Sequence, residues 1–123
     1  MKLRFSMDMS NEFKKSIQPF FWVENGENVS VCLNAGTYRN ELFQTRKEEG
    51  FEGNGYDWTA LATRFLKEKL PNLKNAIEFD SEAEMFCAYS SDKDALEKFI
   101  IGFKNACENN FLIQDLFSKI ELD

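Results

Sequence analysis

The dipeptide Asn25-Gly26, with an apolar segment on each side, constrains the fold more than any other feature of the sequence. Residues 17–24 (IQPFFWVE) precede it, and residues 29–34 (VSVCLN) follow it closely. Asn-Gly favours the positive-φ turns that join two antiparallel strands. The sequence therefore predicts a β-hairpin here. Pro19 has no N–H to donate, so we expect it at the beginning of its strand or on a sheet edge.

A second hairpin is predicted from the alternation of apolar and acidic residues further along the chain. Its strands cover residues 76–80 and 84–90, on either side of a turn at residues 81–83. Alternate side chains of a strand point to opposite faces, so we expect Ile77 and Phe79 to face a core and Glu78 and Asp80 to face solvent. Residues 3–9 also alternate, and we expect a further strand there.

Four helices are predicted. One apolar stripe at helical spacing follows Asp57, the expected N-cap, and stops at Pro71. A second stripe covers residues 95–107 and follows Ser91 and Asp94, which resemble a capping box. Shorter helices are expected after Thr37, ending before Gly50, and after Asn109-Asn110.

These elements predict an α+β fold, in which two β-hairpins form an antiparallel sheet and about four helices pack over one face. The length of 123 residues fits a single domain spanning residues 1–123, with residues 1–16 as an N-terminal extension or an edge strand. The 13 phenylalanines predict a Phe-rich core. No apolar run approaches the roughly 20 residues of a membrane span, and the start lacks a signal-peptide pattern, so we expect a cytoplasmic protein.

Several classes of chemistry lack the residues that they need. The chain has no histidine, which excludes Ser-His-Asp and Cys-His catalysis and the common zinc sites. Glycines 50, 53 and 55 are followed by no Gly-Lys-Ser/Thr and are flanked by carboxylates, so no phosphate loop is predicted. The three cysteines are odd in number and lack CxxC spacing, so we expect buried free thiols. We expect no cofactor and no metal.

The charge of the chain favours a protein partner over nucleic acid. Its formal net charge is −6, and it has no cluster of Lys and Arg. The four acids Glu78, Asp80, Glu82 and Glu84 match no EF-hand loop, and the simplest interpretation is a solvated outer face of the hairpin. From residue 78 to residue 97 there are seven acids against Lys93 alone, which would speed association with a basic partner.

Residues 48–58 (EEGFEGNGYDW) form the second candidate surface, because aromatic side chains interleaved with charge suit recognition. Phe51 and Trp58 are expected to fold back into the core, while the glycines allow the turn. The candidates for partner binding in this loop are Glu48, Glu49, Glu52, Asn54 and Tyr56, of which Asn54 and Tyr56 are the more open.

Three segments together resemble immunity protein family fifty-one of bacterial polymorphic toxin systems. They are FFWVENGENVSVCLNAGTY, EEGFEGNGYDW and EFDSEAEMFCAYSSDKDALEKF, and the resemblance covers about residues 19–123. It implies a protein without enzymatic activity that binds a cognate toxin domain and blocks its active site or an exosite. The acidity of the chain suggests that this partner is basic. The resemblance assigns no contact residues.

Two other functions remain open from the residues alone. Paired carboxylates could serve a small hydrolase that acts through carboxylates, with its best site at residues 78–84. A general regulatory or interaction module could use a sheet edge or the glycine loop. In each case we expect a monomer or a weak homodimer, without direct nucleic-acid or membrane binding.

Overall fold

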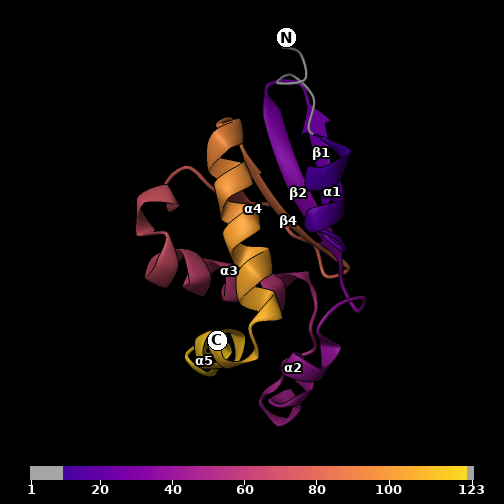
Figure 1. Ribbon diagram of the computed structural model, residues 1–123. Coiled ribbons are helices and arrows are strands. Elements are labelled where there is room, and N and C mark those ends of the chain that lie inside the picture. The colour runs from indigo at the N-terminus through magenta and orange to yellow at the C-terminus, as the bar shows by residue number, and fades with distance from the viewer. Residues whose placement is uncertain (1–9, 122–123) are drawn as a thin grey trace.

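The computed structural model describes residues 10–121, which form one antiparallel sheet covered by helices (Figure 1). The α+β class predicted from the sequence is confirmed. The strands are β1 (Phe21–Asn25), β2 (Asn28–Asn34), β3 (Glu78–Phe79) and β4 (Met85–Ser90). The α-helices are α1 (Asn11–Ser16), α2 (Asn40–Gln44), α3 (Gly55–Lys69), α4 (Lys93–Glu108) and α5 (Asn110–Ser118), and the short 3-10 helices are η2 (Lys47–Glu49) and η3 (Pro71–Leu73).

The two predicted hairpins meet at the centre of the sheet. The strand order is β1-β2-β4-β3, and all neighbouring strands are antiparallel. In the first hairpin Asn25 pairs with Asn28 across the turn, where Gly26 has a φ of +66°. A positive φ costs glycine little because it has no Cβ, and this explains the Asn-Gly signal. The inner strands β2 and β4 are therefore joined by pairing rather than by a turn.

Within residues 10–121, the helices cover one face of the sheet. In Figure 1, α4 runs beside β4 and β2, and α3 and α5 lie near the lower end of α4. Helix α4 contacts β2 and β4, α3 contacts β4, and α5 packs on α3 and α4. Val31, Leu33, Phe86 and Ala88 are fully buried between the sheet and these helices. The layer arrangement expected for an antiparallel sheet with one solvated face is confirmed.

Aromatic rings fill the core, as the phenylalanine content predicts. Trp58 lies at its centre and packs edge-on against Phe20 and Phe103 and stacks on Tyr38. Such offset and edge-to-face pairs contribute beyond the area that they bury. The fully or almost fully buried phenylalanines are Phe20, Phe43, Phe51, Phe65, Phe86, Phe99, Phe103 and Phe117.

The positions of three predicted helix starts are wrong, because other side chains take the capping role. Asn54, not Asp57, caps α3 by accepting from the Asp57 N–H at 2.9 Å. Asp92, not Ser91, caps α4 by accepting from the Ala95 N–H. Thr37 does not cap α2: its hydroxyl donates to the Asn34 carbonyl, and the helix begins at Asn40.

Strand β1 is shorter than the apolar segment at residues 17–24 predicted for the first hairpin. The Phe20 N–H donates to the Ile17 carbonyl at 2.9 Å, which closes a turn directly after α1, so β1 begins only at Phe21. Pro19 thus precedes the edge strand β1. The strand expected at residues 3–9 lies outside the described residues. Within residues 10–121, no helix is long and apolar enough to cross a membrane.

Candidate functional site

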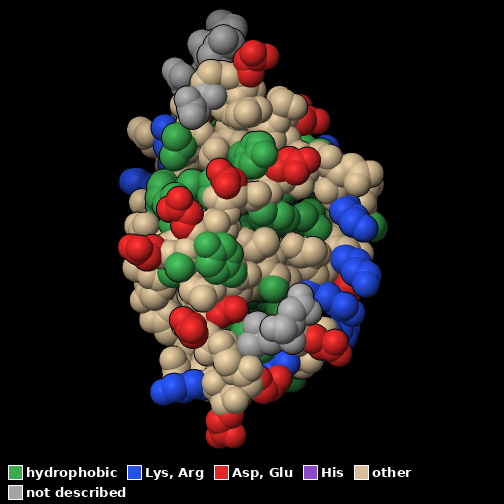
Figure 2. All heavy atoms as spheres, turned by 180° about the vertical axis from the view of Figure 1, so that it is seen from behind, with side chains coloured by type: hydrophobic (Ala, Val, Ile, Leu, Met, Phe, Trp, Pro, Cys, Tyr) green, Lys and Arg blue, Asp and Glu red, His purple; other side chains and the backbone are tan. Residues whose placement is uncertain are grey.

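The sheet face that the helices leave uncovered carries the most distinctive surface of the molecule. We call it the outer face. It consists of the strand residues whose side chains point away from the helices, by alternation with the buried ones. Figure 2 shows hydrophobic side chains gathered over the middle of the molecule as seen from behind α4, with Asp and Glu side chains around them. The outer-face residues are Phe21, Val23, Ser30, Cys32, Asn34, Glu78, Asp80, Met85, Cys87 and Tyr89.

The strand register arranges these side chains in rows that run from an apolar edge to an acidic edge. One row contains Val23, Ser30, Tyr89 and Glu78. The next row contains Phe21, Cys32 and Cys87, and it ends at Asp80, whose N–H donates to the Cys87 carbonyl at 3.0 Å. Edge strand β1 therefore supplies the apolar border of the outer face, and edge strand β3 supplies the acidic border.

The apolar part of the outer face is open to solvent at β1. Phe21 is 39% exposed and Val23 is 41% exposed, although both lie in a regular strand. Tyr89, Met85 and Cys87 on β4 are partly exposed on the same face, separated from β1 by strand β2. Large apolar side chains that adjoin on one face are typical of surfaces that bind another protein.

The acidic border continues around the turn between β3 and β4. Glu82 exchanges backbone hydrogen bonds with Met85 at 2.9 and 3.1 Å, and Glu84 follows in the turn. Glu78, Asp80, Glu82 and Glu84 are all exposed, and none of them takes part in an ion pair within residues 10–121. Their negative charge is therefore directed to solvent and to any partner. Throughout residues 10–121, no group of three or more Cys, Asp or Glu is placed to hold a metal ion.

The glycine loop at residues 50–55 is tied to this turn and to the core. The Asp57 carboxylate accepts from the N–H groups of Glu52 and Gly53, each at 2.8 Å, and so satisfies two loop donors. The Gly55 N–H donates to the Ala83 carbonyl at 2.9 Å. Phe51 and Trp58 are buried, which confirms that both anchor the loop in the core.

The structure divides the loop candidates into two groups. Tyr56 is 58% exposed at the start of α3, directly after the contact between Gly55 and the β3–β4 turn, and so lies near Glu82 and Glu84. Glu48, Glu49 and Glu52 lie toward α2 instead, and Glu52 borders a hollow with Lys47 and Gln44. No described contact joins these three to the acidic hairpin.

Two of the loop candidates already have structural partners. Asn54 uses its side-chain oxygen to cap α3. Glu49 forms a bidentate ion pair with Arg46 at 2.6 and 2.8 Å, and the hydrogen bond from Arg46 holds the pKa of Glu49 below its ordinary value. The Arg46 guanidinium also donates to the Phe117 carbonyl and lies over the Phe51 ring. Glu49 thus helps to fasten α5 to the loop.

Sequence reasoning missed the apolar part of the outer face: Phe21, Val23, Met85, Cys87 and Tyr89. A signal was present, because β1 (FWVEN) and β4 (MFCAYS) carry apolar residues in successive positions. A sheet with one solvated face needs apolar residues at alternate positions only. The additional apolar residues of β1 and β4 therefore indicate a sheet face that is apolar although no helix covers it. Cys87 is accordingly half-buried, whereas the expected burial of Cys32 and Cys107 is confirmed.

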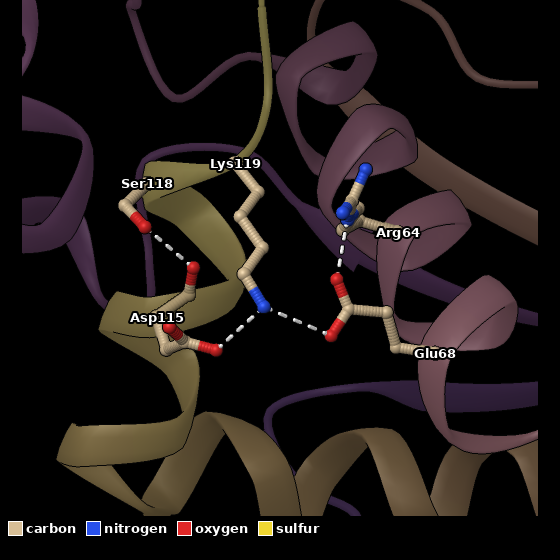
Figure 3. A network of polar contacts seen from close by, with 5 residues as sticks. All are labelled: Arg64, Glu68, Asp115, Ser118 and Lys119. Atoms are coloured by element: carbon tan, nitrogen blue, oxygen red, sulfur yellow. Dashed lines mark hydrogen bonds and ion pairs between the residues drawn. The ribbon is translucent and has the colours of Figure 1, made fainter.

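A cluster of charged residues fastens α3 to α5 on another side of the molecule (Figure 3). The Lys119 ammonium lies 3.2 Å from Glu68 and 3.0 Å from Asp115, and Arg64 lies 2.6 Å from Glu68. Hydrogen bonds from Arg64 and Lys119 lower the pKa of Glu68, and the hydrogen bond to Asp115 raises the pKa of Lys119. The cluster borders an open hollow of about 600 Å³. Because Arg64 and Lys119 already pair with carboxylates, their positive charge is neutralised within the chain.

Comparison with known protein families gives a match over most of the chain. The model of a family described as Immunity protein 51 matches residues 20–122, which is most of the chain. The match includes both hairpins, the glycine loop and helices α2 to α5. No curated protein and no solved structure shows significant similarity to the chain.

Proposed function

Because the chain belongs to the Immunity protein 51 family, we propose that it binds and neutralises a cognate toxin domain of a bacterial polymorphic toxin system. It acts in the cytoplasm of the producing cell by forming a stable complex, without catalysing a reaction. The toxin is blocked when the complex covers its active site or an exosite nearby.

The observation that carries the proposed mode of binding is the composition of the outer face. Interfaces between proteins typically have an apolar centre and a polar rim. The partly exposed Phe21, Val23 and Tyr89 supply the apolar part, and the carboxylates of the β3–β4 hairpin supply one side of the polar rim. The helices pack on the opposite face, so a partner can approach this one directly.

The charge of the rim indicates a basic partner. Glu78, Asp80, Glu82 and Glu84 lack ion-pair partners within residues 10–121, so their field is not neutralised inside the chain. Complementary charge steers encounters and can raise the association rate constant well above the roughly 10⁵ to 10⁶ M⁻¹s⁻¹ of neutral pairs. A toxin domain with a basic surface around its active site fits this description.

Among the candidate contact residues, we assign docking to the four hairpin carboxylates and to Tyr56. Tyrosine is enriched at interfaces because its ring is rigid and amphipathic. Asn54 supports the docking surface indirectly, through the cap of α3. Glu49 is engaged in the Arg46 pair, which fastens α5 to the loop. Glu48 and Glu52 lie outside the docking surface.

The test is neutralisation of the toxin domain encoded by the adjacent gene. The purified domain should lose its activity in proportion to added protein, reaching background at a one-to-one ratio. The same pair should give a saturable binding curve in calorimetry. Absence of binding between the two purified proteins would contradict the proposal.

A further inference from the structure

Two of the three cysteines lie directly opposite each other at the centre of the outer face. Cys32 on β2 pairs in register with Cys87 on β4, although the two residues are far apart in the sequence. Both are free thiols, and Cys87 is the more exposed of the two. The third cysteine, Cys107, is fully buried in α4, on the helical side of the sheet.

The hydrogen-bond pattern shows that the side chains of this pair approach as closely as two antiparallel strands allow. The Ala35 N–H donates to the Glu84 carbonyl in the same register, and hydrogen-bonded pairs alternate with non-hydrogen-bonded ones along an antiparallel ladder. Cys32 lies three positions before Ala35, and the two kinds of pair alternate at every position, so Cys32 and Cys87 form a non-hydrogen-bonded pair. The Cys87 N–H and carbonyl confirm this, because they bond to the Ser81 hydroxyl and the Asp80 N–H, both on the β3 side.

A non-hydrogen-bonded pair satisfies the main distance requirement of a disulfide. Its Cα atoms are about 4.5 Å apart, and disulfides join Cα atoms about 4.4 to 6.8 Å apart. The two thiols influence each other: burial raises the pKa of Cys32 to about 12, and the neighbouring Cys87 thiol adds to the rise. Cys32 therefore remains protonated at neutral pH, and the more exposed Cys87 is the thiol that an oxidant meets first.

We propose that Cys32 and Cys87 form a reversible intramolecular disulfide when the free protein meets a small disulfide oxidant such as oxidised glutathione. The Cys87 thiolate attacks one sulfur of the oxidant, breaks its S–S bond and releases one glutathione thiolate, which takes up the proton that Cys87 lost. The Cys32 sulfur then attacks the Cys87 sulfur of the mixed disulfide, displaces the second glutathione and passes its proton to it. Two protein thiols are oxidised, and one glutathione disulfide is reduced to two thiols.

This inference concerns the protein without a partner and does not depend on the proposed function. The fold supplies the second step, because the register holds the Cys32 sulfur beside the Cys87 sulfur. Cys107 has no cysteine opposite it among the described residues, and burial raises its pKa. It serves as the internal control for general oxidation.

The experiment exposes reduced, folded protein to oxidised glutathione, blocks the remaining thiols with an alkylating reagent, and measures the intact mass and the thiol count after denaturation. Wild type should lose two of its three thiols and two hydrogens in mass, stay monomeric on a non-reducing gel, and regain both thiols with dithiothreitol. Protease digestion should yield one linked product containing Cys32 and Cys87.

Substitutions distinguish the two steps. Cys107→Ala should form the same disulfide, whereas Cys32→Ala should stop at a glutathione adduct on Cys87, and Cys87→Ala should keep both remaining thiols. Three unreacted thiols, a stable glutathione adduct on the wild type, a disulfide-linked dimer, or a disulfide that includes Cys107 would each overturn the proposal. The wild-type digest decides the question even if a variant fails to fold.

Discussion

Gly55 lies directly against the backbone of Glu82: a Cβ atom at position 55 would be 1.9 Å from the Glu82 carbonyl oxygen and 2.5 Å from that of Met85. The first residue of α3 and the turn of the acidic hairpin therefore touch through their main chains. Because the Gly55 N–H also donates to Ala83, this contact sets where the hairpin carboxylates stand relative to the core.

The first prediction is that Gly55→Ala destabilises the fold by about 3 kcal/mol or more, because backbone atoms cannot move aside as a side chain can. Gly102→Ala is the matched control, since it is also helical and the nearest atoms to its added Cβ belong to side chains, Phe65 Cζ at 3.0 Å and Leu70 Cδ1 at 3.5 Å. Its cost should be smaller, as the gain in helix propensity offsets part of the strain. Urea denaturation of both variants measures the difference, and equal costs would contradict the account.

Two neighbouring aromatic residues should differ sharply in their effect on stability. Trp58 is 1% exposed in the centre of the aromatic core, so Trp58→Ala should lower the free energy of unfolding by about 3 to 5 kcal/mol. Tyr56→Ala should change it by about 0.5 kcal/mol or less, as is usual for exposed positions. Thermal and denaturant unfolding measure both. A large loss for Tyr56→Ala would mean that this side chain is structural rather than available to a partner.

Reversal of charge on the hairpin should slow toxin association. In Glu82→Lys/Glu84→Lys the attractive field at the docking surface is removed, so the association rate constant and its dependence on salt should both fall, with a smaller change in the dissociation rate. Glu48→Lys/Glu52→Lys changes the net charge equally but on the α2 side, and should have a weaker effect. Stopped-flow or surface-binding kinetics at several salt concentrations give these rates. A stronger effect from the second pair would place docking at the glycine loop.

The charge cluster of Figure 3 predicts how the stability depends on pH. Arg64 and Lys119 lower the pKa of Glu68, so the stabilisation from Glu68 is complete above the ordinary glutamate pKa of about 4.3 and is lost as pH falls through the lower folded-state value. Lys119 has a raised pKa, so its contribution is complete below the ordinary lysine value of about 10.4 and is lost as pH rises through the folded-state value.

Glu68→Gln tests the acid side of this dependence. At neutral pH the free energy of unfolding of this variant should differ only a little from that of wild type, because solvent screens the ion pairs of Glu68. In acid this difference should vanish. Glu48→Gln, at an exposed glutamate on η2, is the control for the loss of one carboxylate charge. A difference for Glu68→Gln that stays constant from neutral to acid pH would contradict the assignment of this cluster.

Local sequence signals predicted both hairpins and helices α2 to α5, but not the exact ends of these elements, and helix α1 was not predicted. The Asn25-Gly26 turn and the stripes of α3 and α4 depend on neighbours in the chain, and these predictions are confirmed. Asp57 was predicted to cap a helix, but its carboxylate accepts hydrogen bonds from the N–H groups of Glu52 and Gly53. These N–H groups come close to Asp57 only when the loop is folded. Capping side chains compete for donors, and the outcome depends on tertiary contacts.

The candidate site was predictable in part. The exposure of Glu78 and Asp80 follows from strand alternation, and the burial of Phe51 and Trp58 was expected from their size. The position of Phe21 beside Cys32 and Cys87 could not be predicted, because it depends on the pairing of β2 with β4, which no turn specifies. In β1 and β4 apolar residues occupy successive positions, so the sequence of these two strands could not show which of their faces the helices leave open.

The central claim is that the toxin binds the outer face of the sheet, and a matched pair of substitutions tests it most directly. Val23 on the outer face and Ile101 on α4 are exposed to nearly the same degree, 41% and 42%. The measurement is the Kd of the neighbouring toxin domain for Val23→Arg and for Ile101→Arg, with both variants first shown to be folded. Val23→Arg should weaken binding by about thirtyfold or more, the effect of losing a 2 kcal/mol contact, while Ile101→Arg stays close to wild type. Wild-type affinity for Val23→Arg together with a loss for Ile101→Arg would contradict the claim and place the toxin on the helices.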